Sequence, residues 1–203
     1  SIGKSFAENN ICEMGYAVSK IYARSIIEEF SIRFDENIHC LEDLLFMYQY
    51  LLHCDYLVLN HMQNYVYVKH SFSLSHRIHS FESEYCCFVK YQQLLAEMMK
   101  VWKIPAGDMV VTVNSMLVPF RRALKSDYQP DRTIPREMRV KHLKRMISES
   151  RDVFLKYYHP VFKTDKLGKV LLGFNCYILY DFYIRLLFRL NIGPVFYGPK
   201  HMY

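Results

Sequence analysis

The sequence contains few glycines and prolines, with 7 of each among its 203 residues. This scarcity argues against a disordered or collagen-like chain and is typical of a protein dominated by long helices. Only one Trp occurs, although aromatic residues reach 16% of the chain through 17 Tyr and 14 Phe. Hydrophobic residues make up 51% and charged residues 23%, the ordinary balance of a globular protein. The length therefore predicts one domain, or one and a half, with a sizeable core.

The six cysteines form no Cys-x-x-Cys pair, which excludes a zinc ribbon and a thioredoxin motif. We expect reduced thiols in a cytoplasmic protein rather than disulfides. Residues 1–8 have no apolar core behind their single Lys, so no secretory signal peptide is expected. Because the first residue is Ser rather than Met, we expect the chain to be a fragment of a longer protein.

Residues 20–46 carry the most informative pattern. Apolar residues recur at helical spacing up to Phe30, residues 32–34 form a short extended piece, and residues 35–37 indicate a turn. A second helix is then expected to open on Glu42 and Asp43. Two adjacent carboxylates at a helix start are either a helix cap or a catalytic group.

The ordered set of short motifs in this region resembles the family 2 glycosyltransferases, and in particular the bacterial enzymes that build surface polysaccharides. The motifs are Lys-Ile-Tyr-x-Arg-Ser-Ile-Ile-Glu-Glu from Lys20, Ile-Arg-Phe-Asp-Glu-Asn from Ile32, and Glu-Asp-x-x-Phe from Glu42. The resemblance runs from about Gly15 to about Ser75. In that family the Glu-Asp pair closes the GT-A catalytic domain, and its Asp is the usual candidate for general base. The resemblance thus implies that Asp43 is the base and that Glu42 supports it.

Three departures accompany the resemblance. Family members often carry Trp where Val18 stands and Gly where Leu41 stands, and they need an Asp-x-Asp metal site that occurs nowhere in this sequence. The resemblance therefore implies the C-terminal part of such an enzyme, cut from its nucleotide-binding half. A divalent metal (Mg²⁺ or Mn²⁺) and the nucleotide sugar are expected mainly on residues absent from this chain, so the fragment alone should be inactive. An Asp-x-Asp upstream in the full reading frame would favour this interpretation.

Two short strands are predicted at residues 56–59 and 65–68, which are rich in aromatic and β-branched residues. The polar, basic segment 69–77 follows them. Relatives often place a His or Arg and a Ser here, close to the nucleotide diphosphate, and His70, Ser73 and Ser75 are the matching positions. The alternative is an exposed loop between a strand and a helix. His70, His76 and His79 match no standard zinc spacing.

From Phe81 onwards the apolar residues recur at helical spacing. The pattern predicts helices at residues 81–102, 110–124, 135–157 and 167–190, with stripes of large apolar residues that are expected to form a core. The predicted fold class is α+β and predominantly helical, a remnant of a GT-A α/β catalytic domain followed by a C-terminal helical bundle. Residues 1–79 would be the end of the catalytic domain and residues 80–203 the helical subdomain.

Positive charge is concentrated between residues 121 and 145. This stretch alone supplies the formal excess of +6, because only Asp127, Asp131 and Glu137 oppose its nine basic residues. It indicates either a solvated helix face or a surface attracted to anionic lipid. No recognised nucleic-acid motif accompanies it, so nucleic acid is not the expected partner. The basic residues are Arg121, Arg122, Lys125, Arg132, Arg136, Arg139, Lys141, Lys144 and Arg145.

The resulting hypothesis is an inverting transferase that moves a sugar from a nucleotide-sugar donor to a saccharide acceptor in polysaccharide biosynthesis. It would be cytoplasmic and peripheral at the inner membrane face, with contact through residues 121–145. The alternative belongs to another class, a non-catalytic helical interaction or membrane-docking module. Residues 167–190 are too interrupted by Asn175, Asp181 and Arg185 to be a clean transmembrane span.

Overall fold

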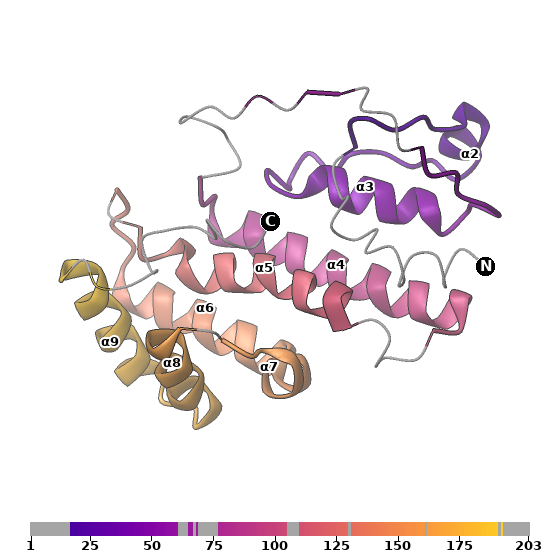
Figure 1. The fold of residues 1–203 in the computed structure, drawn as a ribbon. Coiled ribbons are helices and arrows are strands. Elements are labelled where there is room, and N and C mark those ends of the chain that lie inside the picture. The colour runs from indigo at the N-terminus through magenta and orange to yellow at the C-terminus, as the bar shows by residue number, and fades with distance from the viewer. Residues whose placement is uncertain are drawn as a thin grey trace. The chain divides into compact units, whose positions relative to one another are not determined.

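The computed structural model describes residues 17–60, 65–66, 68, 77–104, 110–129, 131–160, 162–190 and 192, with the backbone alone for 110–116. Across these ranges the protein is predominantly helical, with eight helices and no strand (Figure 1). Contacts group the described residues into two compact units, 17–77 with 86–119 and 78–85 with 120–192. The predicted domain boundary between residues 79 and 80 stays a prediction.

The first unit contains α2 (Arg24–Glu29), α3 (Glu42–Leu51) and most of α4 (Phe81–Trp102), together with the start of α5 (Val110–Ser126). Ile32, Phe46 and Tyr50 form a buried cluster. The Tyr22 ring packs edge-on against both aromatic members of this cluster, with centroid distances of 5.4 Å to Phe46 and 4.8 Å to Tyr50. The Tyr50 hydroxyl accepts a 2.7 Å hydrogen bond from the backbone N–H of Ala23. These contacts anchor α2 and the segment before it to α3.

The strands predicted in this unit are not observed. Residues 56–59 have no regular secondary structure, and the Tyr56 and Val58 side chains are 79% and 77% exposed. Of the second predicted strand, Tyr65, Val66 and Val68 are described, and none of them is in a strand. A β-strand is stable only when it pairs with a neighbouring strand, and the described residues provide no such neighbour. The prediction of a predominantly helical protein is confirmed, whereas its α+β component is not supported.

The second unit contains α6 (Arg136–Glu149), α7 (Arg151–Tyr157), α8 (Lys163–Gly173) and α9 (Tyr177–Arg189), with the start of α4 and the end of α5. The rings of Phe120, Phe154 and Tyr158 pack together with centroid distances of 5.6–5.9 Å. Helix α9 packs against both α6 and α8. A Cβ atom added at Gly168 would lie 2.9 Å from the Tyr180 ring, so glycine permits the close approach of α8 to α9.

Two helices predicted as single segments are each divided. The predicted helix 135–157 is α6 and α7, separated at Ser150, whose φ of −126° leaves the helical region. The predicted helix 167–190 is α8 and α9, separated at Asn175, which has a left-handed φ of 58°. The N–H of Cys176 then donates to the Leu171 carbonyl at 2.8 Å, the bond of a Schellman helix end. Apolar spacing did not reveal these breaks because it continues across them.

Acidic residues from other helices bind much of the basic stretch 121–145 within this unit. Arg122 forms two hydrogen bonds with Glu84, at 2.7 and 2.8 Å, and both side chains are buried. Arg139 forms two with Asp181, at 2.6 and 2.9 Å, and these side chains are buried as well. Arg121 lies 2.9 Å from Asp165. These cations hold helices together and do not form a solvated face.

Three basic residues of the stretch remain exposed on α6 with no ion pair among the residues that the structure describes, namely Arg136, Lys141 and Lys144. Arg145 is also exposed but binds Glu82 at 2.9–3.0 Å, and Arg132 donates to the backbone carbonyls of Ile78, His79 and Ser126. Contact between the whole stretch and a membrane would therefore require the bundle to open.

Lys125 gives this unit a testable dependence on pH. Its Nζ lies 3.3 Å from Asp165 Oδ1, and burial lowers the pKa of Lys125 to about 8, although the charge of Asp165 partly opposes this shift. Between pH 8 and 10 the unfolded chain binds more protons at this lysine than the folded chain, so the contribution of Lys125 to the free energy of unfolding should rise with pH by about 2 kcal/mol. Urea unfolding at several pH values measures this change in the free energy of unfolding. Lys125→Met should remove this rise, and an equal rise in both proteins would contradict the assignment.

Candidate functional site

The helix that carries Glu42 and Asp43 begins with an unusual backbone. Leu41 is the N-cap residue of α3 with φ 64° and ψ 17°, in the left-handed region, and its side chain forms no capping hydrogen bond. A residue with a Cβ pays about 1–2 kcal/mol for that conformation, whereas glycine adopts it freely. Leu41 therefore adopts this backbone conformation at a cost in stability.

Asp43 is the second residue of α3 and does not occupy its N-cap position. Its Oδ1 accepts a hydrogen bond of 2.8 Å from the backbone N–H of Leu44. That amide is one of the first-turn donors that have no partner within a helix. Asp43 therefore helps to satisfy the backbone donors at the start of α3.

Burial raises the pKa of Asp43 above its ordinary value, and the neighbouring charge of Glu42 acts in the same direction. The hydrogen bond from Leu44 opposes the shift, because it stabilises the ionised carboxylate. Desolvation is the largest contribution and decides the direction. The carboxylate is consequently a stronger base than a solvated aspartate.

Two further residues interact electrostatically with Asp43. Burial raises the pKa of Tyr22 to about 12 with the help of the Asp43 charge, and the Tyr22 hydroxyl donates to the Ala17 carbonyl at 3.3 Å. Burial also lowers the pKa of Lys20, and here the charge of Asp43 opposes the shift. Both residues belong to the motif that starts at Lys20, but the sequence analysis predicted no interaction of either residue with Asp43. Their position in the same set of motifs as Asp43 is the only sequence feature that could have indicated it.

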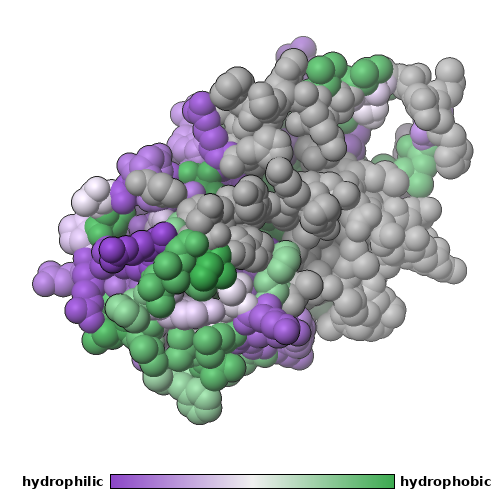
Figure 2. Space-filling view, turned by 60° about the vertical axis from the view of Figure 1, so that its left-hand side comes forward, coloured by the Kyte–Doolittle hydropathy of each residue, from purple (hydrophilic) through white to green (hydrophobic). Residues whose placement is uncertain are grey.

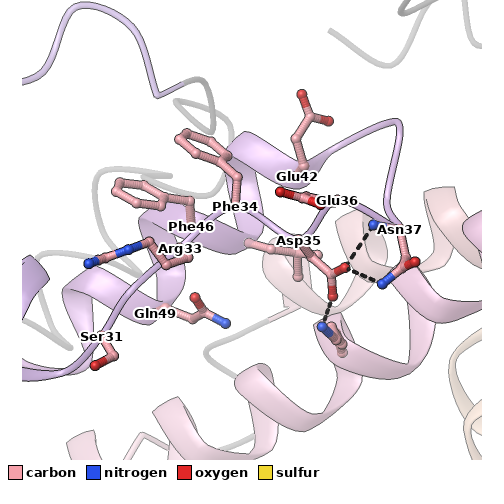
Figure 3. Close-up of a pocket in the computed structure, with 11 residues that line it drawn as sticks. Ser31, Arg33, Phe34, Asp35, Glu36, Asn37, Glu42, Phe46 and Gln49 are labelled. Carbon is pink, nitrogen blue, oxygen red and sulfur yellow. Dashed lines mark hydrogen bonds and ion pairs between the residues drawn. The ribbon is translucent and has the colours of Figure 1, made fainter.

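An open pocket of about 400 Å³ lies beside the start of α3 (Figure 3). Glu42 lines this pocket, whereas Asp43 is not among its lining residues. The rings of Phe34 and Phe46 stack in its wall with centroids 4.5 Å apart, and half of the Phe34 surface is exposed. The lining residues are Ser31, Arg33, Phe34, Asp35, Glu36, Asn37, Glu42, Leu45, Phe46, Gln49 and Lys90.

Most charged groups of the pocket already have partners in the protein. Asp35 accepts hydrogen bonds from the backbone N–H and the side-chain amide of Asn37, at 2.9 and 3.1 Å, and forms an ion pair with Lys90. Arg33 donates to the backbone carbonyls of Ile27 and Ile32. Lys90 comes from α4, far along the chain, so sequence spacing could not place it here. The pocket combines a stacked aromatic surface with carboxylate and amide groups.

The positions predicted to contact the nucleotide, His70, Ser73 and Ser75, lie outside the described residues. Within the described ranges, no group of three or more His, Cys, Asp or Glu side chains could hold a metal ion. The divalent metal and the nucleotide sugar were expected mainly on residues outside this chain, so that expectation stays a prediction.

Comparison with protein families, with curated proteins and with solved structures finds no match to this chain. Among the described residues no helix is long and apolar enough to cross a membrane.

Proposed function

We propose that this chain is the C-terminal part of a family 2 glycosyltransferase of the GT-A type, with residues 1–79 closing the catalytic domain. The enzyme transfers a sugar from a nucleotide-sugar donor to a saccharide acceptor during polysaccharide biosynthesis. The observation that carries the proposal is Asp43, a carboxylate of raised pKa at the start of α3, within the ordered motifs of residues 20–46. Its geometry and its motif support the same role.

Sugar transfer with inversion requires a base that removes the proton of the acceptor hydroxyl as its oxygen attacks the anomeric carbon. In the proposed reaction the new glycosidic bond forms as the bond to the nucleoside diphosphate breaks, and the acceptor proton passes to the Asp43 carboxylate. Burial makes this carboxylate a better proton acceptor. Glu42 supports it through its negative charge and lines the adjoining pocket.

The proposal is tested by incubating the longest natural polypeptide that contains these residues with labelled nucleotide sugars and lipid-linked or free saccharide acceptors. We expect donor-dependent formation of a glycoside whose anomeric configuration, read by NMR, is inverted relative to the donor. The 203-residue chain alone is the control and should form no product. A folded full-length protein that transfers no sugar from any donor would contradict the proposal.

A non-catalytic docking module is the second candidate, and one observation favours it. Helices α8 and α9 and the turn between them expose large apolar side chains, including Phe174, Ile178 and Phe182. Catalysis and docking are compatible, because the transferase we propose is cytoplasmic and peripheral at the inner membrane face. The two functions nevertheless rest on different residues and can be tested separately.

A further inference from the structure

The solvent-facing side of α8 and α9 is apolar to an unusual degree. Phe174, in the turn between the two helices, is 78% exposed, and Phe182 and Ile178 on α9 are 65% and 60% exposed. Figure 2 brings this side of the second unit forward and shows hydrophobic residues gathered there with hydrophilic residues at their edges. We call this surface the α8–α9 face, and its apolar members are Leu167, Val170, Phe174, Ile178, Leu179, Phe182, Leu186 and Leu190.

The spacing along α9 shows that this exposure is not a by-product of core packing. The core side of α9 is complete without the exposed residues, since Tyr180, Asp181, Ile184 and Leu187 are buried at helical spacing. On an ordinary surface helix the opposite side would be polar. Here it carries Ile178, Leu179, Phe182 and Leu186. Large exposed apolar side chains gathered on one side of the unit mark a docking site.

The charged residues of the two helices decide what the α8–α9 face can bind. Five of them are basic, and the only acidic residues of α8 and α9 are Asp165 and Asp181. Both carboxylates are buried and paired with arginines, so neither helix presents a negative charge to solvent. The basic residues are Lys163, Lys166 and Lys169 on α8 and Arg185 and Arg189 on α9.

We propose that the α8–α9 face docks on the surface of an anionic lipid bilayer. A surface of apolar side chains flanked by Lys and Arg is typical of protein segments that bind at the boundary between the lipid headgroups and the acyl chains of a bilayer. A second copy of the chain is a poor occupant, because a two-fold contact would oppose the same basic residues. The face does not need to span the bilayer, and no helix in the described part of the chain is able to.

This proposal places the membrane contact away from residues 121–145, where the sequence had located it. Arg121, Arg122, Lys125 and Arg139 of that stretch are occupied by internal ion pairs. Of the basic residues on the α8–α9 face, Lys169 donates to the Leu155 carbonyl at 3.2 Å, and the other four form no ion pair or hydrogen bond with the residues that the structure describes. Basic side chains and apolar side chains are thus available together on this one surface. The inference does not depend on the proposed transferase activity.

The test is co-sedimentation of the 203-residue chain with phosphatidylcholine vesicles, with and without phosphatidylglycerol. We expect binding to the mixed vesicles that weakens as salt rises from about 0.1 to 1 M, because the Debye length falls from about 10 to 3 Å. Phe174→Ser combined with Phe182→Ser should weaken binding at least about tenfold, since two large apolar side chains no longer enter the lipid. Arg185→Gln combined with Arg189→Gln should weaken binding and reduce its sensitivity to salt.

The matched control is the triple variant Arg136→Gln, Lys141→Gln and Lys144→Gln, which removes exposed charges from α6 and should retain most of the binding. Circular dichroism verifies that each variant is folded, as expected for exposed positions. Failure of the wild-type chain to bind the mixed vesicles would overturn the proposal. The proposal would also be overturned if the phenylalanine variant bound the mixed vesicles as tightly as the wild-type chain. A greater loss of vesicle binding in the α6 control than in the phenylalanine variant would overturn it as well. A wild-type dimer that the phenylalanine substitutions make monomeric, without vesicle binding, would identify the face as a contact between copies.

Discussion

Asp43→Asn in the full-length protein is expected, if it is the transferase proposed above, to lower turnover about 10²–10⁴-fold, the usual contribution of general acid–base assistance. Asparagine retains the shape of the side chain and an oxygen that can accept the hydrogen bond from Leu44, but it cannot take up the acceptor proton. Donor affinity should therefore change little. The measurement is the initial rate of sugar transfer at saturating donor, together with the donor KM.

Glu42→Gln is the companion variant. It distinguishes the effect of the neighbouring charge from the effect of the Asp43 carboxylate itself. It removes the neighbouring charge that contributes to the raised pKa of Asp43 but leaves the carboxylate of Asp43 in place. We expect a milder loss of turnover than for Asp43→Asn. If Asp43 only stabilises the start of α3, Asp43→Asn should leave both turnover and unfolding free energy nearly intact, because Asn serves helix starts about as well as Asp. Near-normal turnover of that variant would end the catalytic assignment.

The largest effect on stability is expected from Asp181→Ala, at about 3–5 kcal/mol of unfolding free energy. Asp181 and Arg139 join α9 to α6 through two hydrogen bonds, and both side chains are buried. Removing the carboxylate leaves the guanidinium buried without its partner, which costs far more than the pair contributes. Urea unfolding of the 203-residue chain, followed by far-UV circular dichroism, measures the change.

Glu82→Gln provides a matched control for the buried pair. Glu82 binds Arg145 at 2.9–3.0 Å, but the two side chains are 66% and 42% exposed to solvent. The loss of this pair should cost at most about 1 kcal/mol. The double variant Arg139→Met with Asp181→Leu should recover part of the stability lost in Asp181→Ala, because no charge is then left unpaired. Equal losses for Asp181→Ala and Glu82→Gln would contradict the role assigned to the buried pair.

Sequence patterns determined most of the helical architecture. The apolar spacing after Phe81 predicts helices where the described residues contain α4–α9, and Glu42 was correctly expected to open α3. These features are local, because the hydrogen bonds and side-chain spacing of a helix involve residues three or four apart. The same locality explains the errors at Ser150 and Asn175, where apolar spacing continues although the backbone leaves the helix. The role of Asp43 as a base stays a prediction drawn from the family resemblance.

Only the tertiary structure decided which side chains are available for function. Glu84, Asp165 and Asp181 bind arginines of the basic stretch 121–145 inside the second unit. These carboxylates are distant in sequence from the stretch, so its local pattern could not predict the ion pairs. The predicted strand 56–59 depended on a pairing partner that the described residues do not contain. The pKa of Asp43 is raised because burial outweighs a helix start that favours the ionised form, and burial is a property of the folded chain. Pairing, burial and exposure depend on residues far apart in the sequence, so no local pattern encodes them.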